Sequence, residues 1–130
     1  MKLMFDYTAI SDFLSSSLKD RIVYELSSPK KSNKAWNRFS HGVDEVINTE
    51  YIYFKGNAVN EKIKSEIKNS GTMGIVLSAE CQAGKTMSID AIFDYLSEEC
   101  NAALALIENW LVIKPEYEGG KAVFYILRKK

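Results

Sequence analysis

Apolar side chains recur every three or four positions over the first fifty residues, which is the spacing of amphipathic helices. The first such stretch covers residues 10–26 and ends before Pro29, because proline disfavours helical backbone in the residue that precedes it. The second covers residues 33–48, with Ser32 as its expected N-cap and Gly42 in its middle. The pattern predicts two helices that pack against each other as a hairpin.

After residue 48 the pattern changes to short β-branched and aromatic runs separated by polar stretches. Four of these runs have the length of a β-strand: residues 51–54, 72–78, 110–113 and 123–127. The last two flank residues 118–121, which contain two adjacent glycines and predict the turn of an antiparallel β-hairpin.

Two shorter helices are expected between these strands. Residues 59–67 keep the helical spacing and are followed by Gly71, which suits a left-handed cap, and residues 89–98 follow Ser88 as their N-cap. The elements together predict an α+β protein with a small, mostly antiparallel sheet of three or four strands that helices cover on one side.

A length of 130 residues with 46% hydrophobic side chains fits a single domain, with a helical part at residues 1–48 and an α+β part at residues 49–130. The seventeen basic and seventeen acidic residues cancel, which argues against a histone-like DNA-binding protein. No stretch reaches the roughly 18 apolar residues of a membrane span, and the first residues lack the apolar core of a secretory signal. We therefore expect a cytoplasmic protein without a membrane partner, whose two cysteines are reduced.

Residues 79–86 share features with a phosphate-binding loop, because Gly84-Lys85-Thr86 lies between an apolar run and a helix. Three observations oppose a nucleotide site there. Ala79 stands where the leading glycine is required, Glu80 would repel a triphosphate, and the remaining chain is too short for the parallel sheet of those enzymes. The sequence favours a polar turn between a strand and a helix.

No set of catalytic or metal-binding residues stands out. His41 is the only histidine, and we expect a surface or half-buried side chain with one hydrogen bond rather than a member of a triad. One histidine and two cysteines nineteen residues apart cannot form a zinc site. We therefore expect no enzymatic activity, no cofactor, no metal and no small-molecule substrate, and we assign Trp110 to the core.

The charges are distributed unevenly along the chain. Residues 19–38 hold six basic and two acidic side chains, whereas residues 90–118 hold seven acidic and one basic side chain. An acidic region with interspersed aromatic rings suits a basic partner surface, although such charges can also serve only to keep a surface soluble. The hypothesised partner-binding residues are Tyr95, Glu98, Glu99, Glu108, Glu116, Tyr117 and Glu118.

Residues 101–110 admit two structures that lead to different functions. As a helix they would complete a winged-helix DNA-binding arrangement, with Asn101, Asn109 and Lys121 near the nucleic acid. Against this, the helix would carry no lysine or arginine, and the two adjacent glutamates before it would repel phosphates. As a strand they would lie in the middle of an α+β sandwich.

Short features are spread over most of the chain: the run Leu26–Lys31, Trp36, Arg38-Phe39, His41, the turn from Ser78 to Met87 and the hairpin at Pro115–Glu118. Together they resemble small bacterial immunity proteins of toxin and contact-dependent growth-inhibition systems. The resemblance implies a cytoplasmic protein without catalytic residues that binds a cognate protein toxin, often a nuclease, and occludes its active site. A carboxylate-rich surface suits this function, because a nuclease is basic where it holds phosphates. A winged-helix transcription regulator is the alternative.

Overall fold

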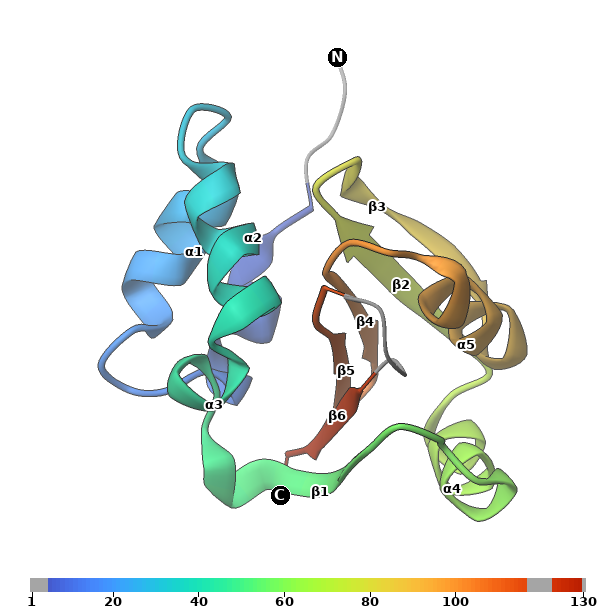
Figure 1. The fold of residues 1–130 in the computed structure, drawn as a ribbon. Coiled ribbons are helices and arrows are strands. Elements are labelled where there is room, and N and C mark those ends of the chain that lie inside the picture. Colours follow the sequence, from blue (N-terminus) through green and yellow to red (C-terminus); the bar gives the residue numbers. More distant parts are fainter. Residues whose placement is uncertain (1–4, 117–122, 130) are drawn as a thin grey trace.

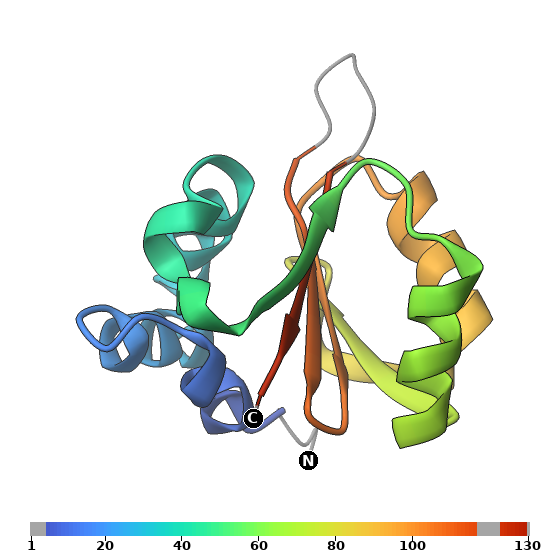
Figure 2. The ribbon, with the colours of Figure 1, turned by 90° about the horizontal axis from the view of Figure 1, so that it is seen from below.

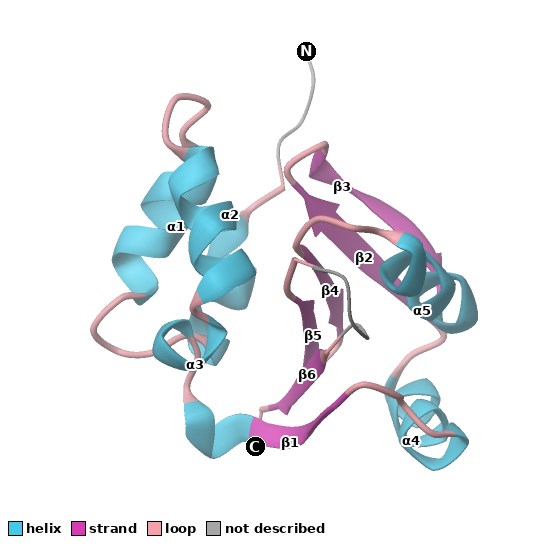
Figure 3. Ribbon diagram, viewed as in Figure 1, coloured by secondary structure: helices cyan, strands magenta, loops and turns pink. Residues whose placement is uncertain are grey.

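The chain forms a six-stranded antiparallel sheet with the strand order β1-β6-β5-β4-β2-β3 (Figure 1). The computed structural model describes residues 5–116 and 123–129. The strands are β1 (Ile52–Gly56), β2 (Met73–Ser78), β3 (Cys81–Ser88), β4 (Ala103–Ile107), β5 (Trp110–Lys114) and β6 (Phe124–Arg128). Figure 3 shows them in magenta between the helices, which confirms the predicted α+β class.

Helices cover both faces of this sheet, so the expectation that they cover one side is wrong. Figure 2 shows the N-terminal helices on one face and α4 and α5 on the other. The helical elements are η1 (Tyr7–Phe13), α1 (Lys19–Ser27), α2 (Ser32–His41), α3 (Val43–Val46), η2 (Thr49–Tyr51), α4 (Glu61–Ser70) and α5 (Ile89–Glu98). The physical reason lies in the central strands, whose successive side chains point to opposite faces and are nearly all apolar. Leu104 and Leu111 pack on the N-terminal helices, whereas Ala105 and Val112 pack on α4 and α5.

The first predicted helix is interrupted. Instead of one helix over residues 10–26, the structure has the 3₁₀ helix η1 and the α-helix α1, separated by an extended segment. In that segment Leu14 pairs with Ile47 as an isolated β-bridge, and the amide of Ser15 donates to the carbonyl of Val46 at 2.7 Å. These contacts to a distant part of the chain compete with helical hydrogen bonds, while the periodic apolar side chains remain buried or partly buried.

The second predicted helix is also divided, because Gly42 lies between α2 and α3 with a non-helical backbone. Ser32 is a buried residue of α2 and not its N-cap; Lys31 occupies that position, without a side-chain hydrogen bond. Gly71 does not adopt the left-handed conformation, since its φ of −175° is extended. The sequence thus predicted the helices better than their ends. The predicted helical hairpin is confirmed, because α1 and α2 pack together.

The predictions for the second half of the chain are largely confirmed. β2 is a strand, the Ser88 hydroxyl caps α5 by accepting from the amide of Ala91, and β5 pairs with β6 as an antiparallel hairpin. The turn expected at residues 118–121 lies outside the described residues. Residues 103–107 form the strand β4, so the second helix of the winged-helix arrangement is not formed.

The segment that shares features with a phosphate-binding loop is mostly strand. Only the residues between Ser78 and Cys81 form a turn, and the expected polar turn continues as β3. In the part of the chain that the structure describes, β3 is an edge strand that pairs only with β2. Lys85 and Thr86 are exposed on this strand, three and two residues, respectively, before the N-cap of α5. A phosphate-binding loop needs its Lys and Thr at the start of a helix, so this geometry is absent here.

Tyr7 connects the N-terminal layer to the edge strand. Its buried hydroxyl donates to the carbonyl of Gln82 at 2.6 Å, and burial raises the pKa of Tyr7 to about 12, with a smaller contribution from Cys81. An unfolded tyrosine loses its proton from about pH 10 upward, whereas folded Tyr7 keeps it. Since the unfolded state binds fewer protons in this window, ionisation of this tyrosine lowers the free energy of unfolding between pH 10 and 12.

Replacement Tyr7→Phe isolates this effect. At pH 7 we expect the variant to be less stable by about 1 kcal/mol, because the carbonyl of Gln82 loses its donor. By pH 11 the wild type should have lost about 1.4 kcal/mol relative to the variant. Urea unfolding at pH 7, 9, 10 and 11 measures the difference, and a constant difference would contradict the assignment.

Candidate functional site

One end of the sheet collects carboxylates from three separate parts of the chain. The pairing register places Ser78 of β2, Ala103 of β4 and Lys114 of β5 in one row across the sheet. The β2–β3 turn, the loop that follows α5 and the segment after β5 therefore meet at this end. We call the four glutamates of these segments and of the last turn of α5, together with the tyrosine that donates to one of them, the acidic end. Its members are Glu80, Glu98, Glu99, Glu116 and Tyr95.

Hydrogen bonds hold part of this surface in place. The hydroxyl of Tyr95 donates to the carboxylate of Glu99 at 3.3 Å and lies 3.5 Å from the hydroxyl of Ser78. That serine accepts from the amide of Cys81 at 3.1 Å, and the other oxygen of Glu99 accepts from the amide of Asn101. Tyrosine is protonated at neutral pH, so the hydroxyl of Tyr95 is a donor there, and burial raises its pKa further. The turn and the helix end are thereby joined through one tyrosine.

The outer face of α5 extends this acidic surface. Its apolar side chains point into the sheet, which leaves Asp90, Asp94 and Glu98 exposed at intervals of four residues on one side of the helix. Lys68 of α4 forms an ion pair with Asp90 at 3.1 Å, at the start of the helix. The negative charge that is left without such a partner among the described residues therefore lies toward the end of α5.

A buried lysine underlies the acidic end. Lys114 is fully buried, and its ammonium group donates to the carbonyls of Glu99 and Pro115. Burial lowers the pKa of Lys114, and the negative charges of Glu99 and Glu116 oppose this shift. A cation that binds the last carbonyls of a helix also interacts favourably with the helix dipole. Lys114 thus fixes the loop after α5 from beneath, while the carboxylates remain at the surface.

His41 lies at the rim of the acidic end. Its Nε2 atom is 3.2 Å from a carboxylate oxygen of Glu116, and its side chain is 59% exposed. This agrees with the expectation of a surface histidine with a single polar contact. The contact connects the C-terminus of α2 to the segment after β5.

The structure brings together four of the seven residues hypothesised to bind a partner: Tyr95, Glu98, Glu99 and Glu116. Glu108 does not belong with them. It lies in the β4–β5 turn with a φ of 48°, at the opposite end of a five-residue strand and hence roughly 13 Å along the sheet. Tyr117 and Glu118 lie outside the described residues.

Sequence reasoning missed two residues of this region. In the sequence, Glu80 argues only against a phosphate-binding loop, and Lys114 is the one basic residue of the acidic stretch 90–118. The sequence does contain a signal for Lys114, because this lysine directly continues the apolar run of β5. A lysine in such a position is expected to reach a buried acceptor. For Glu80 no local signal exists, because its neighbourhood depends on the pairing of β2 with β4.

Other kinds of site find no support in the described residues. No group of three or more His, Cys, Asp or Glu side chains in residues 5–116 and 123–129 could hold a metal ion. Within the same residues, no helix has the length and apolar character that crossing a membrane requires. Comparison with protein-family models, with curated proteins and with solved structures gives no match for this chain.

Proposed function

We propose that the protein is a non-enzymatic inhibitor of the immunity type, which binds a basic protein through the acidic end. The observation that carries the proposal is that the strand register brings four glutamates from separate segments, Glu80, Glu98, Glu99 and Glu116, to one end of the sheet, where Glu99 accepts a hydrogen bond from Tyr95. A carboxylate-rich surface of this kind complements a positive partner surface and steers the encounter of the two proteins.

The mechanism is occlusion. A nuclease or another enzyme that acts on phosphates is basic where it holds its substrate, and carboxylates on a rigid surface can occupy the same positions. Tyr95 supplies an aromatic ring within this surface, and aromatic side chains are frequent anchors in protein interfaces. The resemblance to immunity proteins agrees with this function, in which the protein would act in the cytoplasm on a cognate toxin.

Charge reversal tests the proposal. The triple variant Glu80→Lys/Glu98→Lys/Glu116→Lys should weaken binding to the partner at least tenfold, because each lysine faces a basic surface. The matched control is Glu61→Lys/Glu66→Lys/Glu108→Lys, which changes the net charge equally at positions away from the acidic end. The partner is first isolated with the tagged wild-type protein at near-physiological salt, with nuclease treatment in a parallel sample.

Calorimetric titration with the purified partner then measures the affinities of the wild type and of the two triple variants. Equal affinities for wild type, triple variant and control would contradict the proposal. Retained DNA that disappears on nuclease treatment, with no protein partner, would instead favour the DNA-binding alternative. Its affinity would then fall with salt in proportion to the number of phosphates contacted.

A further inference from the structure

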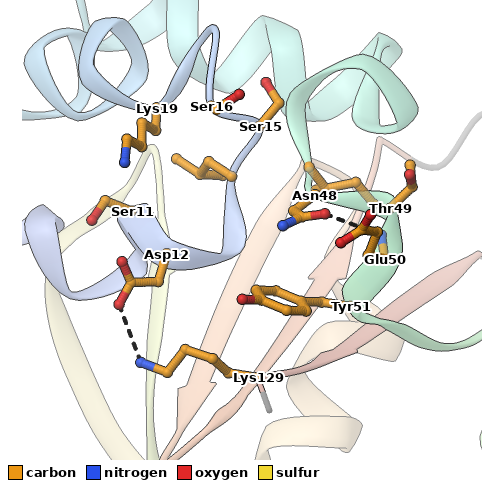
Figure 4. A pocket seen from close by; sticks show the side chains of 12 residues that line it. Ser11, Asp12, Ser15, Ser16, Lys19, Asn48, Thr49, Glu50, Tyr51 and Lys129 are labelled. Carbon is orange, nitrogen blue, oxygen red and sulfur yellow. Dashed lines mark hydrogen bonds and ion pairs between the residues drawn. The ribbon is translucent and has the colours of Figure 1, made fainter.

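A polar groove lies at the other end of the sheet, away from the acidic end. Its main hollow has a volume of about 660 Å³, within the roughly 300–1,000 Å³ of small-molecule sites. Its walls come from η1, the start of α1, η2 and the residue after β6 (Figure 4). Three parts of the chain, residues 11–19, residues 47–51 and Lys129, therefore form one cavity.

The walls of this groove are fixed to one another by backbone contacts. Leu14 and Ile47 pair as a β-bridge beneath it, and the amide of Asn48 donates to the carbonyl of Phe13 at 2.9 Å. The amide of Ser15 donates to the carbonyl of Val46 on the same seam. The groove is thus formed before any ligand arrives, which limits the entropy lost on binding.

Three hydrogen-bond donors face the groove, two from η2 and its N-cap and one from the start of α1. The side-chain oxygen of Asn48 accepts from the amide of Glu50 at 3.1 Å, and this leaves its nitrogen directed into the groove. Figure 4 shows the hydroxyl of Tyr51 beside it and the ammonium group of Lys19 across the hollow. Among the described residues, Lys19 has no carboxylate within ion-pair distance, whereas Lys129 is paired with Asp12 at 3.3 Å. One unneutralised cation and two neutral donors are a set that suits an oxyanion.

A second hollow of about 420 Å³ adjoins the first and shares Glu50, Tyr51 and Lys129 with it. It adds two planar groups, the ring of Tyr53, which is 43% exposed, and the guanidinium of Arg128. Both are held by the buried indole of Trp110. The Tyr53 ring lies edge-on to the indole with centroids 5.2 Å apart, and the Arg128 guanidinium lies 5.0 Å above the indole. Planar groups of this kind bind the face of an aromatic heterocycle.

We propose that the two hollows together bind a mononucleotide. The phosphate lies against Lys19, Asn48 and Tyr51, and the base lies against Tyr53 and Arg128. The carboxylate of Glu50, which lines both hollows, accepts hydrogen bonds from the ribose hydroxyls. This site is independent of the inhibitor function, because the acidic end lies at the opposite end of the sheet.

Titration with the four ribonucleoside 5′-monophosphates, followed by amide NMR shifts, tests the proposal. At least one should bind with a dissociation constant in the micromolar to millimolar range and shift the amides of residues 47–53 and 128–129. Lys19→Gln should weaken its binding at least tenfold and leave the melting temperature unchanged. The matched control is Lys62→Gln, at an exposed lysine of α4, which should leave the affinity within twofold.

Further ligands distinguish the contributions of the two hollows to binding. Inorganic phosphate should compete with the mononucleotide, and Lys19→Gln should weaken the binding of inorganic phosphate. Tyr53→Ala should weaken the binding of the mononucleotide and leave the binding of inorganic phosphate unchanged. If none of the four mononucleotides shifts these amides at 5 mM, on the order of the weakest site expected, the proposal is wrong. Equal binding of the nucleoside without its phosphate, or an equal loss in Lys62→Gln, would also overturn it.

Discussion

Replacement of Arg38 by methionine should lower the free energy of unfolding by about 3–5 kcal/mol, although Arg38 is itself one third exposed. The reason is its partner. Glu25 of α1 is 2% exposed and accepts two hydrogen bonds from the Arg38 guanidinium, at 3.0 and 3.2 Å. The same bidentate contact raises the pKa of Arg38. Without it, a carboxylate stays buried between two helices with no adequate partner.

Arg21 provides the matched control for this prediction. It also contacts Glu25, at 3.6 Å, but its side chain is 67% exposed, so Arg21→Met should cost less than about 1 kcal/mol. The double variant Glu25→Leu/Arg38→Met should recover most of the loss, because it removes the unpaired charge as well as its partner. Urea unfolding of the four proteins at pH 7 measures these differences. Equal losses for the two single arginine variants would show that the buried contact is not the cause.

The Glu25–Arg38 pair also shows what periodic patterns leave out. Periodicity predicted that these two helices pack as a hairpin, and the apolar stripes of both are buried or partly buried. It could not show that a glutamate would be buried between them, since charged residues are usually expected on the solvated side. Nor could it place the break after Phe13, because the competing hydrogen bond comes from Val46. Contacts between distant residues decide both features.

The predicted number of strands, three or four, is smaller than the six of the structure for a related reason. Its edge strand β3 is short of β-branched and aromatic residues, so its eight residues read as a turn. The pairing with β2 makes it a strand, and pairing cannot be deduced from local composition. The continuous apolar runs in β4 and β5 did contain the missing information. Strands with two apolar faces require cover on both sides, which the structure supplies with α5 on one face and α2 on the other.

Some residues of the candidate site could also be predicted from the sequence, and others could not. Tyr95, Glu98 and Glu99 could be predicted to lie together, because they are neighbours at the end of one helix. Glu116 joins them through Lys114, and Glu80 through the pairing of Ser78 with Ala103. Glu108 belongs to the same acidic stretch of the sequence but lies apart from these residues in space. A two-residue turn reverses the chain at Glu108, so the following strand returns toward the acidic end while the glutamate stays at the far end.

Replacement of Gly74 by alanine should lower the free energy of unfolding by about 3 kcal/mol. Gly74 is buried in β2, where a methyl group would lie 2.5 Å from Cγ1 of Ile107 and 2.9 Å from Cδ1 of Ile92. It would also lie 2.9 Å from the carbonyl oxygen of Leu106, which belongs to the backbone of the neighbouring strand. Side chains can turn away from an added methyl group, but this carbonyl can move only if the strands separate.

Gly71→Ala is the control, since the same methyl group there meets the flexible side chain of Glu108 at 3.0 Å on an extended backbone. We expect its stability to stay within about 0.5 kcal/mol of the wild type. A double-mutant cycle with Ile107→Ala then separates the two causes in Gly74→Ala. Removal of Cγ1 should reduce the cost of the new methyl group without abolishing it, because the Leu106 carbonyl remains. If Gly74→Ala is as stable as Gly71→Ala, the close approach of β2 and α5 to β4 does not depend on this glycine. If the cost vanishes completely beside Ile107→Ala, side-chain crowding alone explains it and the backbone contact contributes nothing.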